Sequence, residues 1–458
     1  MIRYGLDFGT TNSSIAHLVG GEPRLLKIDN KAQDPEIIRS LLYFFHRDLV
    51  VKKDKYGHQT SSYSGEFNFA FGQNALENYL HDNKNRSPGI IRQIYTGKMV
   101  STGPGADLVA EYFEEVDFGV GRLMQALKTA LKSPTYKGTN IFGKFFSLEQ
   151  MISLFVSLIK QASDQTLREK VDAIKVGRPV HFLDNPAGDK KVEQRLKDSL
   201  KMVGFKQIEF EYESVAAAKY FLQKFHLQKQ KILVFDFGGG TLDTAVVLYD
   251  DGFKILATDG IYIGGNLLNS DIMKLKLNDY FGSKMYWGDQ RLPIAPHIFD
   301  SLNSWYGIIN LNNPADMRLL DKIHYKNSDP SALERLTYLI KMNLGFEIYE
   351  AIETAKKNLS NLETTKIKFS DGPIDIDIEI SRDEFENLIT PRINSIKEVV
   401  IKTLKSAKTE PEEIEIVVRT GGSSLIPMVE KMLVDLFGQE KVQLFDTFTS
   451  IAAGLALE

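Results

Sequence analysis

The sequence predicts an α/β fold made of two similar lobes that face each other across a cleft. Strand-like and helix-like patterns alternate along the 458 residues, which is typical of such folds. "YGLDFGTTNSSIAHL" at 4–18 and "KILVFDFGGGTLDTAVV" at 231–247 share one plan: apolar strand, aspartate, glycine turn, apolar strand. Because these openings lie about 230 residues apart, they indicate two related halves.

The elements are expected in a defined order. Runs rich in β-branched, aromatic and other apolar residues predict strands at 2–7, 13–19, 23–28, 173–177, 207–211, 231–236, 243–249, 252–258, 365–370, 374–380 and 414–418. Apolar residues spaced three or four apart predict helices at about 120–131, 147–170, 189–203, 213–224, 264–280, 345–359, 382–406, 424–437 and 446–456.

This order also predicts how the chain divides. We expect lobe I over 1–226, lobe II over 227–440, and a last helix within 441–458 that returns to lobe I. Two polar tracts, at about 46–106 and 284–330, interrupt this alternation of strands and helices. They predict insertions that carry short helices.

The composition limits the classes of function. Hydrophobic residues make up 43% of the chain and the formal net charge is −4, so a basic surface for nucleic acid or anionic lipid is not expected. The absence of cysteine excludes disulfides, thiolate metal sites and cysteine nucleophiles. We expect a cytoplasmic protein, because no apolar run of about 18 residues and no signal-peptide pattern is present.

The two glycine turns carry the candidate chemistry. Glycine lets backbone N–H groups approach a ligand closely, and several such groups form a concavity that suits phosphate. Asp7 and Asp236 end the strands that precede these turns. A carboxylate beside a phosphate needs a cation between them, and Mg²⁺ is typically held by one or two carboxylates and substrate phosphates. The pair of turns indicates a nucleotide–Mg²⁺ clamp; the alternative is two tight hairpins capped by their acids.

A third glycine pair occurs in "VVRTGGSSLIPMVEKML" at 417–433, between an apolar strand and an amphipathic helix. Gly421 and Gly422 are suited to close approach by a nucleoside or its α-phosphate. The sequence contains neither the phosphate-loop pattern GxxxxGK[ST] nor a GxGxxG that opens a helix. The phosphates are therefore expected between two hairpins rather than on a helix terminus.

These motifs resemble the ATPase domain of the DnaK-type chaperones, the heat-shock protein 70 family, within the actin-like ATPase superfamily. The resemblance is carried by "GLDFGTTNS", "VFDFGGGTLD", "ILATDGIYIGGNLLNSDI" (255–272), "EAIETAKKNLS" (350–360) and "TGGSSLIPMVEKML", in this order. It implies an α/β, two-lobed fold of duplicated ribonuclease H-like domains with ATP at the base of the cleft. It reaches nearly the whole chain except the two insertions.

The resemblance also implies roles for single residues. Asp7 and Asp236 would hold hydrated Mg²⁺, and Thr241 would contact the γ-phosphate. The residues implied to bind the nucleotide are Thr10, Thr11, Asn12, Gly238, Gly239, Gly240, Gly264, Gly265, Glu353, Lys356, Ser360, Gly421, Gly422 and Ser423. Independently, Glu353, Lys356 and Ser360 share one face of a helix, which without the family is typical of a solvated charged surface.

Hydrolysis would depend on residues outside the turns. "RLMQALKTALKS" at 122–133 resembles the helix that carries the family's catalytic lysine, which makes Lys128 the candidate and Lys132 its competitor. Glu213 in "EYESVAAAKYF" matches a carboxylate near the attacking water. Pro179 in "VGRPVHF" matches a proline that couples nucleotide state to the outer surface.

Three departures from the family pattern bear on function. The family has proline after this glutamate, whereas this chain has Ser214, and it often has an arginine against the adenine where this chain has Leu425. "FTSIAAGLALE" at 448–458 resembles the last helix of the ATPase domain, so we expect an ATPase domain without the peptide-binding domain, as in YegD-like members.

The expected function is ATP binding, followed by slow Mg²⁺-dependent hydrolysis that switches the lobes between two states. A co-chaperone, exchange factor or client protein would read the switch. Three alternatives stay open at this level: a small-molecule kinase of the same superfold, a filament-forming protein, and an adaptor that binds nucleotide without hydrolysing it.

Overall fold

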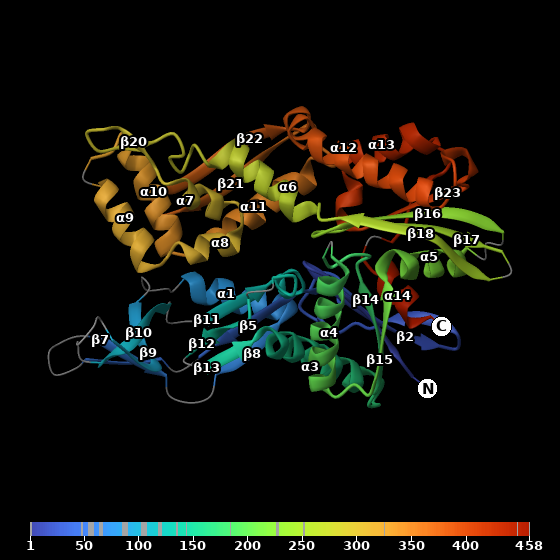
Figure 1. The fold of residues 1–458 in the computed structure, drawn as a ribbon, viewed down its shortest axis with the longest axis horizontal. Coiled ribbons are helices and arrows are strands. Elements are labelled where there is room, and N and C mark those ends of the chain that lie inside the picture. Colours follow the sequence, from blue (N-terminus) through green and yellow to red (C-terminus); the bar gives the residue numbers. More distant parts are fainter. Residues whose placement is uncertain are drawn as a thin grey trace.

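The computed structural model has two α/β lobes, one above the other in Figure 1. It describes residues 2–46, 49–53, 59–63, 67–84, 90–101, 108–117, 121–133, 136–142, 144–183, 185–225, 229–250, 252–324, 326–446 and 448–457. Each lobe is organised around one larger sheet.

The sheet of lobe I has the strand order β15–β14–β1–β2–β3, and that of lobe II the order β18–β17–β16–β23–β24. In lobe I the strands are β1 (Tyr4–Phe8), β2 (Asn12–Val19), β3 (Glu22–Leu25), β14 (Ala173–Arg178) and β15 (Gln207–Tyr212), with β4 (Ile38–Arg39) beside β2. In lobe II they are β16 (Gln230–Phe237), β17 (Leu242–Tyr249), β18 (Phe253–Ile261), β23 (Ile416–Thr420) and β24 (Val442–Leu444).

The two sheets have the same topology. In each, the first three strands form an antiparallel meander, and the fourth and fifth strands add in parallel beside the first. The central strands are buried on both faces, as their continuous apolar runs require. The duplicated two-lobed α/β fold predicted from the paired motifs is confirmed.

Helices α5 (Glu213–Lys224) and α14 (Ser450–Ala456) lie between the sheets (Figure 1). Small residues allow α14 to pack closely: a Cβ atom at Gly454 would lie 1.8 Å from the Ala216 carbonyl oxygen, and one at Gly5 would lie 2.4 Å from the Ala456 nitrogen. The last helix therefore contacts both β1 and α5.

The remaining helices cover the outer faces. In lobe I, α3 (Leu148–Leu167) packs against α4 (Pro186–Val203). Lobe II contains α6 (Gly265–Ile272), which continues as a π-helical turn (Met273–Leu277), and α11 (Gly345–Asn358), α12 (Arg382–Ser406), α13 (Pro427–Phe437) and the hairpin β21 (Thr364–Asp371)–β22 (Ile374–Ser381). Within the described residues, no helix combines the length and apolarity that crossing a bilayer requires.

The predicted helix at 120–131 is wrong. Residues Gly121–Gln125 form strand β11, which pairs with β5 (Leu41–Phe45), and only Leu127–Ala130 form a short helix, α2. Ala126 between them has a left-handed backbone with φ of 53°, which interrupts any continuous helix. Pairing with β5, which also pairs with β8 (Asn68–Phe71), overrides the local helical pattern.

The tract at 46–106 is described only in part. Its described elements are β6 (Leu49–Lys53), β7 (Gln59–Tyr63), β8, α1 (Gly72–Lys84) and β9 (Ile90–Ser101), which pairs with β10 (Leu108–Asp117). Residues 47–48, 54–58, 64–66, 85–89 and 102–106 of this predicted insertion lie outside the described residues. A further hairpin, β12 (Gly138–Ile141)–β13 (Lys144–Ser147), precedes α3.

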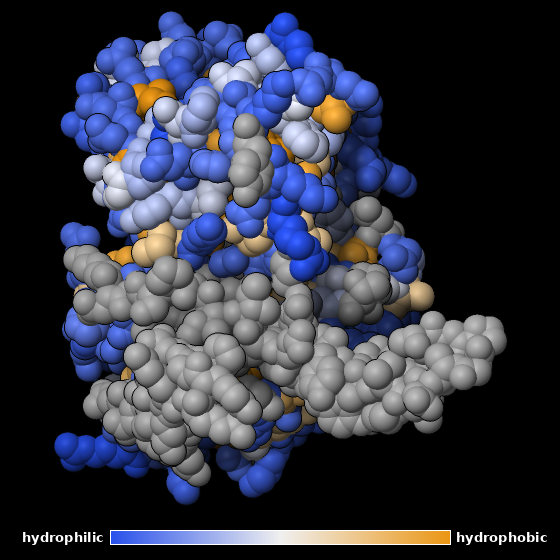
Figure 2. Space-filling view, turned by 90° about the vertical axis from the view of Figure 1, so that its left-hand side faces the viewer, coloured by the Kyte–Doolittle hydropathy of each residue, from blue (hydrophilic) through white to orange (hydrophobic). Residues whose placement is uncertain are grey.

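The tract at 284–330 carries short helices, as predicted, but it also contributes to the core. It contains β19 (Tyr286–Trp287), β20 (Leu292–Pro293), α7 (Pro296–Leu302), α8 (Trp305–Asn310) and α9 (Pro314–His324), and α10 (Pro330–Lys341) follows. Ile298, Leu302 and Ile308 are fully buried in the lobe II core. The face of lobe II in Figure 2 is largely hydrophilic. Asp289, Gln290 and Arg291 of this tract are exposed.

Candidate functional site

The two glycine turns predicted from the sequence face each other across the lobes. A Cβ atom at Gly239 would lie 2.6 Å from Thr11 Oγ1, and one at Gly240 would lie 2.9 Å from Thr10 Oγ1. The second turn is closed by a hydrogen bond from the Gly238 N–H to the Thr241 carbonyl, 3.0 Å. A larger residue at either position would displace a threonine side chain of the first turn, so glycine suits this close approach of the two hairpins.

A cavity lies between these turns and gathers most of the predicted site. The residues predicted from the sequence that line it are Asp7, Thr10, Thr11, Asn12, Lys128, Lys132, Pro179, Glu213, Asp236, Gly238, Gly239, Gly240, Thr241, Gly421 and Gly422. The sequence reasoning did not single out Gly9, Phe448 and Ile451, which also line it. No local signal in the sequence marks Phe448 and Ile451, because the packing of α14 brings them there.

The cavity wall carries more negative than positive charge. Lys128 is buried and donates a hydrogen bond to Glu213. Burial opposes the charged form of Lys128, but the Glu213 and Asp7 carboxylates outweigh it and raise the pKa of the ammonium. Burial, followed by repulsion from Glu213, raises the pKa of Asp7 to about 7 and that of Asp236 well above its ordinary value.

The donor set fits a hydrated Mg²⁺ ion. Asp7, Asp236, Glu213 and Asp243 lie close to the ammonium of Lys128. Repulsion from Glu213 adds to burial in raising the pKa values of Asp7, Asp236 and Asp243, and a cation would relieve this repulsion. Within the described residues, no three or more histidine, cysteine or acidic side chains are grouped to hold a metal by themselves. Mg²⁺ suits this arrangement, because it keeps several waters and completes its shell with substrate phosphates.

The predicted nucleoside contacts pack behind the second turn. Lys356 Nζ is buried and donates to the Gly265 carbonyl at 3.0 Å and to Glu353 Oε2 at 2.6 Å. Burial lowers the pKa of Lys356, against the opposing effect of Glu353. Ser423 Oγ donates to the Gly238 carbonyl at 2.9 Å. This group therefore fixes the backbone that forms the second turn.

Two more predicted residues are placed by the same packing. A Cβ atom at Gly264 would lie 2.5 Å from the Gly239 carbonyl oxygen, so only glycine fits there as well. Ser360 lies in the turn beyond the end of α11 at Asn358, and it lines neither the cavity between the turns nor the wider cavity that contains Glu353.

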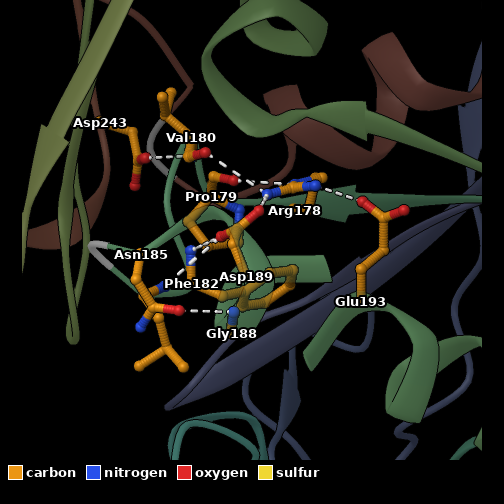
Figure 3. Close-up of polar contacts among 10 residues, drawn as sticks. Arg178, Pro179, Val180, Phe182, Asn185, Gly188, Asp189, Glu193 and Asp243 are labelled. Atoms are coloured by element: carbon orange, nitrogen blue, oxygen red, sulfur yellow. Dashed lines mark hydrogen bonds and ion pairs between the residues drawn. The ribbon is translucent and has the colours of Figure 1, made fainter. Parts of the chain in front are cut away.

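A polar cluster extends from the cavity to the outer surface through Pro179 (Figure 3). Asp243 Oδ1 on β17 accepts a hydrogen bond from the Val180 N–H at 2.7 Å, so lobe II contacts the loop after β14. On the other side of Pro179, Arg178 pairs with Asp189 and Glu193 of α4. The sequence singled out Pro179 alone, because nothing local marks its partners in lobe II and α4.

The two residues that depart from the family pattern are also placed. Ser214 is fully buried at the start of α5, and its Oγ has no hydrogen-bond partner among the described residues. Leu425 is 39% exposed at the end of the short turn that follows Gly421.

The duplicated lobes, with glycine turns that face each other over a cavity lined by carboxylates, define a class of two-lobed α/β proteins. The sequence model of the family described as "Hsp70 protein" matches residues 115–285 and 341–458. These segments make up more than half of the chain. The chain belongs to the Hsp70 family.

Curated relatives match along almost the whole chain. It is 25% identical over 464 aligned residues to "Chaperone protein DnaK" of Prochlorococcus marinus (strain MIT 9515) and to "Chaperone protein dnaK" of Cyanidioschyzon merolae (strain NIES-3377 / 10D). Each match covers 99% of this chain but only 58% and 61% of the respective relative. The chain thus spans about three fifths of the length of these chaperones.

Proposed function

We propose that this chain binds ATP with Mg²⁺ between its lobes, hydrolyses it slowly to ADP and phosphate, and acts as a nucleotide-dependent switch. The observation that carries the proposal is the pair of facing glycine and threonine turns above buried carboxylates. Membership in the Hsp70 family, which implies nucleotide binding, supports it. The two relatives named as chaperones support a chaperone-like role.

Different residues around the cavity bind the phosphates, the metal ion and the nucleoside. The N–H groups of Gly239 and Gly240 and the hydroxyls of Thr10 and Thr11 bind the β- and γ-phosphates, while Gly238 closes the turn through its bond to the Thr241 carbonyl. Asp7 and Asp236 would hold Mg²⁺, which supplies charge neutralisation across the phosphates. Glu353, Lys356, Gly421 and Ser423 hold the nucleoside.

Hydrolysis rests on the ion pair at the cavity wall. Lys128 orients the attacking water and stabilises charge on the transferred phosphoryl group, while Glu213 fixes the ammonium and accepts a hydrogen bond from the water. Thr241 contacts the γ-phosphate. Because the turns belong to different lobes, binding of the triphosphate favours the closed arrangement and loss of phosphate relaxes it.

A nucleotide-dependent switch acts through a partner protein that distinguishes its two states. The loop of Pro179 and Val180 connects the cavity to α4, which makes this outer face the proposed contact for a co-chaperone, exchange factor or client protein. We place the protein in the cytoplasm.

The decisive experiment is calorimetric titration with ATP and ADP, with and without Mg²⁺, followed by measurement of phosphate release. We expect Mg²⁺-dependent binding of both nucleotides, and absence of binding would refute the proposal. Lys128→Ala should lower turnover at least about 100-fold while nucleotide still binds. Lys160→Ala is the matched control, since Lys160 is also ion-paired in lobe I, to Asp164, but outside the cavity. Equal turnover in wild type and Lys128→Ala would contradict the assignment of Lys128.

A further inference from the structure

A second cavity of about 330 Å³ opens beside the first. The two cavities share Thr11, Lys132, Gly239 and Gly240, so the second begins where the phosphate-binding turns end. Its outer wall includes Asn303, Ser304 and Trp305, where α7 gives way to α8. These three residues lie between the two segments that match the Hsp70 family model.

Three buried amide oxygens in the second cavity have no hydrogen-bond partner among the residues that the structure describes. They are Gln125 Oε1, Asn269 Oδ1 and Asn303 Oδ1, and all three residues line the cavity. Asn269 is 4% exposed, and its amide nitrogen donates to Glu353 Oε2 at 2.8 Å. Its other amide atom must therefore be the oxygen, which is an acceptor. Buried acceptors are normally paired, so this cavity suits a ligand that presents hydrogen-bond donors.

The charges at the second cavity disfavour a cationic ligand. Glu350 pairs with Arg39 at 2.9 Å, and Glu353 pairs with Lys356 at 2.6 Å. Both carboxylates of the wall are thus compensated. The ammonium of Lys132 lies 4.2 Å from the centre of the Tyr262 ring and adds positive charge. A polyamine would therefore find no uncompensated carboxylate here.

Aromatic rings form the rest of the wall. Trp305, Phe346, Tyr349 and Tyr262 all line the cavity, and the Trp305 and Phe346 rings meet edge to face at 5.9 Å. Rings that alternate with amide groups accommodate a molecule with apolar C–H faces and hydroxyl edges. Sugars and cyclic polyols have this character.

We propose that the second cavity binds a neutral polyhydroxylated small molecule, a sugar or cyclic polyol, alongside the nucleotide. Its hydroxyls donate to Gln125, Asn269 and Asn303, and its C–H face packs on Trp305. The proposal rests on the second cavity alone and stands whether or not the first cavity hydrolyses ATP.

The chain offers a direct probe of occupancy, because it contains only two tryptophans, Trp287 and Trp305. In a Trp287→Phe background the fluorescence reports Trp305 alone. We expect a saturable change on titration with D-glucose or myo-inositol up to about 50 mM, a range that covers weak small-molecule affinities. Spermidine serves as the cationic probe, and calorimetry with ADP and Mg²⁺ on the same samples tests the nucleotide site separately.

Variants test whether the amide oxygens carry the binding. Gln125→Ala and Asn303→Ala should each weaken polyol binding about fivefold or more, while ADP binding changes less than twofold. Gln223→Ala is the matched control, because Gln223 also has a buried amide oxygen without a partner but lies outside the cavity. This variant should bind polyol like the parent.

Several results would overturn the proposal. These are no response to either polyol in protein that is folded by circular dichroism, a response to spermidine in place of the polyols, or equal losses in Gln223→Ala and Gln125→Ala. Competition between ADP and the polyol would also overturn it, because the second cavity would then be part of the nucleotide site.

Discussion

At the scale of single residues, the structure separates two aspartates that the sequence places close together. Asp236 faces the cavity, whereas Asp243 on the return strand holds the Val180 N–H. The sequence alone shows that Asp243 begins the expected strand at 243–249. It could not identify the partner, because Val180 is 63 residues away and belongs to the other lobe.

Asp243 makes stability depend on pH. Burial, with repulsion from Glu213, raises the pKa of Asp243 to about 7 in the folded protein, above its ordinary value of 3.8. The folded state therefore binds more protons than the unfolded state between these values, and stability falls as pH rises from about 4 to 7.

Asp243→Asn removes this titration and keeps an oxygen that accepts from Val180. At pH 8 without Mg²⁺ and nucleotide, the variant should be more stable than wild type by roughly 2 kcal/mol, with the difference vanishing near pH 4. Urea unfolding at a series of pH values measures this difference. A constant offset across all pH values would contradict the assigned titration.

At the scale of elements, prediction succeeds where local pattern and tertiary contacts agree. The expected strands at 231–236 and 243–249 and the expected helix at 382–406 correspond to β16, β17 and α12. The predicted helix at 120–131 fails because β11 gains its hydrogen bonds from β5, a segment about 80 residues earlier. Strand order within each sheet also depends on such distant pairing and cannot be seen in a local window.

Helix α12 shows a local signal with a measurable effect. Ser381 and Glu384 form a capping box, in which Ser381 Oγ accepts from the Glu384 N–H at 3.1 Å. Pro391 removes one hydrogen bond from the helix interior, so the first turns depend more on this cap. Ser381→Ala should lower the free energy of unfolding by about 1 kcal/mol in urea titration. Ser395→Ala, at a half-buried serine within the same helix, is the control and should change it by less than about 0.5 kcal/mol.

At the scale of the whole molecule, contacts between the lobes close the far end of the cleft. The Tyr79 ring on α1 lies 5.6 Å from the Phe346 ring on α11, and its hydroxyl donates to the Asn343 carbonyl at 3.3 Å. Arg39 on β4 pairs with Glu350 on α11. These contacts stabilise the closed arrangement, in which the two glycine turns face each other.

Removal of one contact should speed the opening of the cleft. We expect Tyr79→Ala to release a fluorescent ADP analogue about tenfold faster in stopped-flow measurements. The substitution removes a buried ring contact and a hydrogen bond that form only in the closed state, so it destabilises that state. Tyr338→Ala is the control, since Tyr338 bonds Asp371 on the surface of lobe II, away from the cleft. Equal release rates for wild type and Tyr79→Ala would show that this contact does not limit opening.

The position of α14 has a consequence for synthesis of the chain. Gly5 in the first strand lies against Ala456 near the end of the last helix, so these partners are separated by nearly the entire sequence. The ribosome releases residue 456 long after the first sheet has emerged. The strands of lobe I must therefore wait, with one face uncovered, for a helix made after all of lobe II. Contacts so distant in sequence slow folding, and the exposed face is an opportunity for aggregation during that interval. A protein related to chaperones thus has a nascent chain that itself stays vulnerable until translation has passed residue 456.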